Sequence, residues 1–262
     1  MRLADGLTVP AFVITRFTVL SYIKERVLLV VLIFAFILMI ASYVLAPLAV
    51  GAQTKIIIDI GLASISIFGV LLVILLGASS FSREKDKGIL PNLLAKPISR
   101  VDFVLGKYLG TVLTIWMVMV VMALVYVFVS LLSRSTLNQT IFVAIYLSAV
   151  EVALVTAVMT FFSSFSTPLL SSFFTLCVFI AGHLSKDLLA FAEHFGHGAM
   201  KVTSSIGYYV LPNLSLFNVR PEAVHNLPLM DDLVGTVTLY AAFYIACLLF
   251  LSAVIFRRKD VT

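Results

Sequence analysis

Glu151 is an acidic residue within a long apolar run of the sequence. Glu151 occurs in the apolar run AIYLSAVEVALV, residues 144–155. A charge at the centre of a bilayer costs about 2.5–3.5 kcal/mol on insertion scales, so such a residue must face protein or water. Two hypotheses follow. Glu151 is a cation, proton or pathway site, or it is a protonated acid hydrogen-bonded to a neighbouring helix or across a dimer. The nearby hydroxyls that could serve it are Ser148, Thr156 and Thr160.

The histidines are the other residues that could support chemistry, and all four fall at or beyond the outer ends of the predicted spans: His183, His194, His197 and His225. If helical, His194-x-x-His197 could direct two imidazoles toward one ion, and the thioethers of Met200 and Met230 would suit copper. The glycines that flank His197 argue against a regular helix, and no tight set of four ligands exists. We therefore expect no metal and no cofactor.

Lipid must be the solvent for most of the chain that carries these residues. The 262 residues are 61% apolar and only 12% charged, whereas soluble proteins carry roughly 25% charged residues. The net charge of +5 comes from basic residues beside apolar blocks. This arrangement suits an anionic membrane surface and does not indicate nucleic acid as a partner. The composition predicts an all-α integral membrane protein with one domain, residues 1–262.

Long apolar runs predict six transmembrane helices, because a bilayer core requires about 20 apolar residues. The stretch between Arg134 and Lys186 is long enough for two of them. A serine-rich turn at 163–167 separates the fourth and fifth spans, and Pro168 suits the first turn of the fifth. The two cysteines, Cys177 and Cys247, lie in apolar runs, so we expect packed thiols without a disulfide. The predicted spans are about 27–46, 60–80, 108–132, 140–162, 168–184 and 234–256.

Residues 8–26 predict an amphipathic helix that lies in the membrane interface. Thr8 is the expected N-cap, with Pro10 in the first turn. The alternative is that this segment simply extends the first span. The apolar positions at helical spacing are Val9, Phe12, Val13, Phe17, Leu20, Ile23 and Val27.

The basic residues predict how the spans are oriented. Six spans place both termini on one side, and the positive-inside rule identifies that side as the cytoplasm. In this orientation 13 of the 18 Lys and Arg residues are cytoplasmic and 5 are outside. Residues 184–232 then form a large extracytoplasmic segment, in which Leu211-Pro212-Asn213 and Arg220-Pro221 indicate turns.

The longest polar segment between two apolar blocks is SREKDKGILPNLLAKPISRVDFVLGK, Ser82–Lys107. Gly88 is expected to end the preceding helix, and Ile89–Ala95 to form a short helical turn. Ser99-x-x-Asp102 matches a capping box that opens the next helix. By composition alone the segment is an ordinary solvated loop with positive-inside charge. The alternative is a surface on which a cytosolic partner docks.

The same segment resembles the signature of ABC-2-type transporter permeases. An acidic cluster, a glycine, a leucine-rich turn, Pro-x-Ser-Arg and a Gly-Lys pair occur in the order found in that family. The resemblance implies that the ATPase-docking residues are Glu84, Gly88, Leu90, Leu93, Leu94, Pro97 and Arg100.

Three further segments resemble the same family. Residues 8–26 are similar to its connecting helix. The serine-rich turn and Gly182 are similar to its fourth and fifth spans. Leu211–Asn218, LPNLSLFN, resembles the subgroup that includes the permease of nitrous-oxide-reductase copper maturation and the gliding-motility permeases.

The resemblance implies a bacterial inner-membrane subunit that forms a homo- or heterodimer and binds two cytosolic ABC ATPase subunits. Ile89–Ala95 would be the coupling helix, membrane lipid would surround the spans, and an extracytoplasmic accessory protein could join. No G-x-x-x-x-G-K-[ST] phosphate loop occurs, so ATP hydrolysis is expected in the partner and this chain is not predicted to be an enzyme.

The function implied is an ATP-driven exporter, or a transducer of mechanical work to the outer side. Two alternatives come from other classes. An ion-coupled secondary transporter would use Glu151 and a paired ionisable group on another helix, which the sequence does not reveal. A membrane enzyme built on the outer histidines would need a carboxylate or serine in a tight motif, which is absent.

Overall fold

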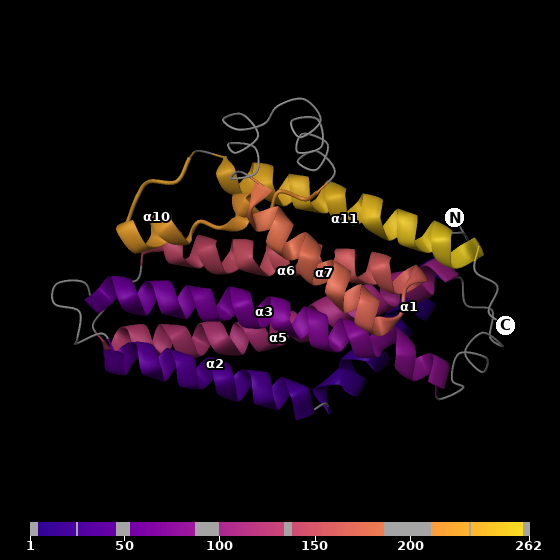
Figure 1. Ribbon diagram of the computed structural model, residues 1–262, viewed down its shortest axis with the longest axis horizontal. Helices are drawn as coiled ribbons and strands as arrows, with labels where there is room; N and C mark the ends of the chain where they lie inside the picture. The colour runs from indigo at the N-terminus through magenta and orange to yellow at the C-terminus, as the bar shows by residue number, and fades with distance from the viewer. Residues whose placement is uncertain are drawn as a thin grey trace.

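The structure is a computed structural model that describes residues 5–24, 26–45, 53–86, 100–133, 138–185, 211–230 and 232–258. These residues form helices and connections, with no strand among them. Most of the helices lie side by side along the long axis of the molecule (Figure 1). The elements are α1 (Asp5–Ile23), α2 (Arg26–Leu45), α3 (Gln53–Asp86), α5 (Arg100–Leu132), α6 (Gln139–Phe165), α7 (Pro168–His183), η2 (Leu214–Phe217), α10 (Arg220–His225) and α11 (Leu233–Arg258).

Four of the described helices are long and apolar enough to cross a membrane. The candidate spans are Gln53–Gly77 in α3, Val101–Leu132 in α5, Gln139–Phe165 in α6 and Leu233–Ile255 in α11. The described apolar parts of α2 and α7 are shorter. The chain is therefore a multi-helix membrane protein, and the count of six spans stays a prediction.

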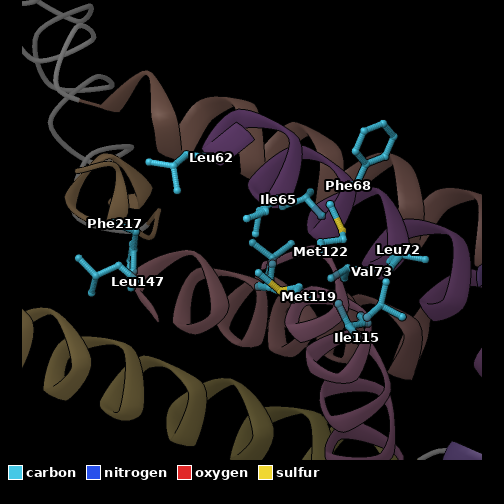
Figure 2. Packing of buried hydrophobic residues seen from close by; sticks show 14 of the residues in the cluster. Leu62, Ile65, Phe68, Leu72, Val73, Ile115, Met119, Met122, Leu147 and Phe217 are labelled. Carbon is cyan, nitrogen blue, oxygen red and sulfur yellow. The ribbon is translucent and has the colours of Figure 1, made fainter. Parts of the chain in front are cut away.

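Helix α3 is one of the central helices of the bundle. It packs against α2, α5, α6, α7 and α10. Figure 2 shows its inward side chains, among them Ile65 and Leu72, meeting Ile115 and Met119 of α5 and, further along, Leu147 of α6. A shift of α3 would therefore displace the side chains of the helices that pack against it, since close-packed interiors transmit displacement.

The ends of α3 lie well beyond the span predicted at 60–80. The helix begins at Gln53 and continues through the charged cluster to Asp86. Hydropathy locates the part of a helix that lies in lipid, whereas Lys, Glu and Arg are good helix formers that let the helix continue into water. The charged residues 83–86 thus form the last turn of the helix.

Helix α1 differs from the predicted 8–26 in two ways. It begins at Asp5, so Thr8 is not its N-cap and Pro10 lies inside the helix. It ends at Ile23, and α2 begins separately at Arg26, so α1 is not an extension of the first span. Whether α1 lies in the membrane interface stays a prediction.

The face of α1 that packs on the protein is not its predicted apolar stripe. The residues buried against α5 and its neighbours are Ile14, Thr15, Thr18 and Tyr22. The stripe itself points outward at Phe12, Val13, Phe17, Leu20 and Ile23. Two glycines of α5 explain the choice, because a Cβ at Gly106 would lie 2.7 Å from Cβ of Ile14 and one at Gly110 would lie 2.6 Å from Cβ of Thr18. Small residues let α1 approach closely, which leaves the bulky stripe free for lipid.

A local signal was confirmed at one helix start, and others were wrong. α7 begins with Pro168, as predicted. α5 begins at Arg100, and its predicted cap, Ser99, lies outside the described residues. Arg220-Pro221 was predicted as a turn, but it opens α10, because proline is tolerated in the first turn of a helix. The thiols predicted to be packed, Cys177 and Cys247, are free but exposed on the outer surfaces of α7 and α11, where apolar helices suit lipid.

Candidate functional site

Glu151, the acidic residue in the apolar run, has an ionisable partner on another helix. Nε2 of His183 in α7 lies 2.7 Å from Oε1 of Glu151 in α6. The Glu151 side chain is 3% exposed and that of His183 is 27% exposed. The expectation that no paired ionisable group exists was therefore wrong. The histidine was assigned to the outer end of a span and was not considered as a partner.

The α6–α7 hairpin brings the two residues together. Only Ser166 and Thr167 separate the helices. Glu151 is 15 residues before Ser166, and His183 is 16 residues after Thr167, so antiparallel helices with equal rise place them at the same depth. Counting outward from the predicted turn would have identified the pair. A second pair of residues at nearly equal distances from the turn is also in contact, since Oγ1 of Thr175 donates to Sδ of Met159 at 3.2 Å.

The second oxygen of Glu151 is only weakly bonded. Oγ of Ser66 in α3 donates to Oε2 over 3.4 Å, close to the limit for a hydrogen bond. The hydroxyls predicted as partners behave differently. Thr156 and Thr160 donate to carbonyls one turn earlier on their own helix, and Ser148 lines the cavity beside Glu151. A carboxylate accepts up to about four hydrogen bonds, so Oε2 retains acceptor capacity.

Glu151 belongs to the wall of a cavity of about 230 Å³ between α3, α6, α7 and the η2–α10 segment. One part of the lining is polar and carries charge, and the rest is aliphatic and aromatic. The polar residues are Ser66, Ser148, Glu151, His183, Asn218 and Arg220, and the larger apolar residues are Leu62, Ile67, Phe179 and Phe217.

Arg220 is loosely held at this cavity. Its Nη1 lies 3.8 Å from Oδ1 of Asp59, and both side chains are partly exposed, at 34% and 59%. An ion pair of this length and exposure contributes little to stability. The guanidinium is therefore available to another anion without a large loss.

The η2 wall of the cavity is fixed against the end of α7. Oδ1 of Asn213 accepts hydrogen bonds from Ser185 at 2.9 Å and Ser215 at 2.6 Å, and its backbone N–H donates to Tyr240. Gly182 permits this contact, because a Cβ there would lie 2.7 Å from the carbonyl oxygen of Pro212. The segment that carries Phe217 and Asn218 is thus positioned by the same helix as His183.

One predicted docking residue lies at the end of α3 that is far from the cavity, and another opens α5. Glu84 is near the end of α3 and Arg100 is the first residue of α5. The other five predicted docking residues lie outside the described residues: Gly88, Leu90, Leu93, Leu94 and Pro97. The predicted coupling turn Ile89–Ala95 and the histidines at 194 and 197 also lie outside them. In the described part of the chain no three potential metal ligands gather.

The first and last described helices, α1 and α11, meet at the start of α5. Ile14 of α1 packs with Phe103 of α5, and Leu249 of α11 joins them. The C-terminal half of α11 and helix α1 are therefore on the same side as the start of α5 (Figure 1).

A family model described as "ABC-2 family transporter protein" matches residues 21–182. The match covers more than half of the chain and runs from the last residues of α1 almost to the end of α7. The fold and this match define a transporter membrane component, and the chain belongs to the ABC-2 family. Members of this family are membrane components that typically pair with ATPase subunits. No curated protein matches the sequence.

Proposed function

We propose that this chain is the permease subunit of an ATP-driven ABC transporter that exports a substrate, or transmits mechanical work, to the outer side of the bacterial inner membrane. The observation that carries the proposal is the family match, which includes the polar connection between α3 and α5 as well as both helices. The resemblance of residues 211–218 to copper-maturation and gliding-motility permeases supports the narrower subgroup, although these residues lie beyond the match.

The ATPase docks on the segment between Glu84 and Arg100, with Ile89–Ala95 as the coupling helix. This segment continues directly from α3, which packs on five other elements. The same helix contributes Leu62 and Ser66 to the cavity near its other end. A push on the docking segment therefore tilts a rigid element that reaches the cavity, which is a hinge or shear mechanism for alternating access.

The cytoplasmic side is the side that holds this segment, both termini and most of the basic residues. Two permease copies, identical or different, provide the surfaces for two ATPase subunits. The exposed apolar faces of the helices contact lipid or the second copy.

The first test is replacement of Leu93 and Leu94 by Asp. Carboxylates at these positions cannot enter an apolar cleft of the ATPase without a large desolvation cost. We expect the tagged chain to be purified in mild detergent without the ATPase activity that accompanies the wild type, a loss of about tenfold or more.

The matched control is replacement of Leu227 and Met230 by Asp. These two apolar residues are exposed in the connection between α10 and α11, at the other end of α3. The control should keep the ATPase. If the Leu93 and Leu94 variant keeps it as well, the docking segment has been wrongly assigned.

A second candidate, an ion-coupled secondary transporter, is favoured by one observation, the Glu151–His183 pair. Transport that continues without ATPase and responds to a proton gradient would support it. Replacing Glu151 by Gln separates a pathway role from a structural one. Loss of transport with normal expression indicates the pathway, whereas unchanged transport indicates a hydrogen-bonded structural residue.

A further inference from the structure

We propose that the cavity between α3, α6, α7 and α10 binds a zwitterion, with its ammonium group on Glu151 and its anionic group on Arg220. The shared chemistry is that of an ethanolamine phosphate headgroup or of a free amino acid. The proposal stands apart from ATPase docking, because it concerns residues at the other end of α3.

The acceptor for the ammonium group is Oε2 of Glu151. The residue is 2% exposed, and Oε1 is already occupied by His183 at 2.7 Å, which leaves Oε2 with a single long contact from Ser66. A buried carboxylate oxygen with spare acceptor capacity is costly unless a donor reaches it. Ser66 and Ser148 lie beside it in the cavity wall and can accept the remaining N–H donors of an ammonium group.

The binding group for the anion is the guanidinium of Arg220. Its distance of 3.8 Å from Asp59 is too long for the two parallel hydrogen bonds that such a fork makes with a well-placed carboxylate or phosphate. Asn218, two residues earlier, adds an amide to the same lining. The anionic end of a ligand would thus replace a weak surface pair with a stronger bidentate contact.

The charge balance and size of the cavity select a small neutral molecule with separated charges. The lining holds one carboxylate and one guanidinium, with an imidazole that already hydrogen-bonds the carboxylate. A simple cation would leave Arg220 with only its long contact to Asp59, and a simple anion would leave Oε2 with only its long contact from Ser66. At about 230 Å³ the cavity lies below the usual 300–1,000 Å³ of pockets for drug-sized ligands. It fits a headgroup or an amino acid, while Phe179 and Phe217 cover the carbon atoms between the charges.

The test measures which lipids stay bound to the purified protein, using native mass spectrometry after exchange into dioleoyl phosphatidylethanolamine, phosphatidylcholine or phosphatidylglycerol. Choline has a positive charge but no N–H donor, and glycerol has no positive charge. We expect retention of phosphatidylethanolamine to exceed that of both others by about tenfold, the ratio that one charged hydrogen bond supplies. Free phosphoethanolamine and alanine are then added as soluble competitors.

Glu151→Gln should remove the preference, because the preference depends on the N–H donors of the ammonium group. Arg220→Gln should lower the retention of phosphatidylethanolamine, because it removes the group that binds the phosphate. His225→Gln is the control, since His225 is an exposed residue of the same helix α10. Arg220 is partly exposed, so its variant should fold even if Glu151→Gln does not.

Three outcomes decide the matter. Retained phosphatidylethanolamine that is lost in the variants supports a lipid headgroup as ligand. Binding of alanine or phosphoethanolamine without a lipid preference, lost in the same variants, supports a soluble zwitterion. No preference among the lipids and no binding of either soluble probe overturns the proposal, as does unchanged retention of phosphatidylethanolamine in a folded Arg220→Gln protein.

Discussion

At the scale of the residue, the Glu151–His183 pair explains how a carboxylate is accommodated in an apolar helix. Oε1 of Glu151 and Nε2 of His183 share a hydrogen bond, so the carboxyl group has a polar partner inside the apolar bundle. Such a partner offsets part of the cost of burying a carboxyl group away from water. His183 remains partly exposed to the cavity, so the pair is both a structural contact and a group that a ligand can reach.

We predict that His183→Ala destabilises the protein more than Glu151→Gln does. The first change leaves a buried carboxylate with only the distant Ser66 hydroxyl, at a cost of about 1–3 kcal/mol. The second leaves an amide that can still hydrogen-bond the imidazole. Thermal unfolding in detergent measures both effects.

The double variant with both changes should lose less than the sum of the two, because the partners interact directly. His225→Ala should change the unfolding midpoint little, since that side chain is exposed. Strictly additive losses would show that the two groups are not coupled.

The residue scale is also where sequence reasoning succeeded least. An acidic residue inside an apolar run could be recognised as significant, but its partner is 32 positions away and depends on how two helices pack. The loosely paired Arg220 was hidden in a segment interpreted as a turn. Local sequence patterns carry no information about contacts between helices. The short connection at Ser166 and Thr167, however, would have shown that Glu151 and His183 lie at the same depth in the membrane.

At the scale of the element, the closest contact is that of α1 with α5. The backbone of α1 approaches two glycines one helical turn apart, Gly106 and Gly110. Oγ1 of Thr15 also donates to the carbonyl oxygen of Gly106 at 3.2 Å. Because α5 follows directly on the proposed docking segment, our proposal implies that α1 is attached to the first turns of a helix that a bound ATPase would move.

We predict that Gly106→Val separates α1 from α5. A Cβ there would lie 2.9 Å from the carbonyl oxygen of Ala11, and backbone cannot move aside cheaply. Overpacking of this kind costs about 1–3 kcal/mol, measurable as a lower midpoint of thermal unfolding.

Gly235→Val is the matched control for that change, because nothing lies within 4 Å of the new Cβ. It should leave the midpoint unchanged or raise it slightly. Equal losses from both variants would show that general helix effects, and not the contact with α1, determine the stability.

Some helix ends are marked by a residue type in the sequence, and others are not. The start of α7 could be predicted, since a first-turn proline acts within one turn of helix. The start of α1 and both ends of α3 could not, because hydropathy marks the lipid-embedded part and is silent on how far polar turns continue.

At the scale of the whole molecule, the membrane class and the all-helical architecture follow from composition, because so few charged residues could not cover a soluble globule. The orientation rests on the distribution of basic residues. α1, the start of α5 and the last turns of α11 share one end of the bundle, and η2 and α10 lie toward the other end (Figure 1).

We predict that a membrane-impermeant maleimide distinguishes these two ends in intact cells. In a background with Cys177 and Cys247 replaced by Ala, Asn226→Cys should react from outside, and Lys87→Cys should react only after the membrane is opened. The reverse pattern would invert the orientation. The parent protein is the control, since its thiols lie on apolar helix surfaces that face lipid.

The short connection between α6 and α7 has a consequence for how the chain enters the membrane during synthesis. Two residues are too few to let one helix insert long before the other. The two helices therefore leave the insertion machinery as one antiparallel hairpin, and Glu151 meets His183 before either is exposed to hydrocarbon alone. A hydrophobic segment with a carboxylate in its middle can then be inserted at little more than the cost of an apolar one.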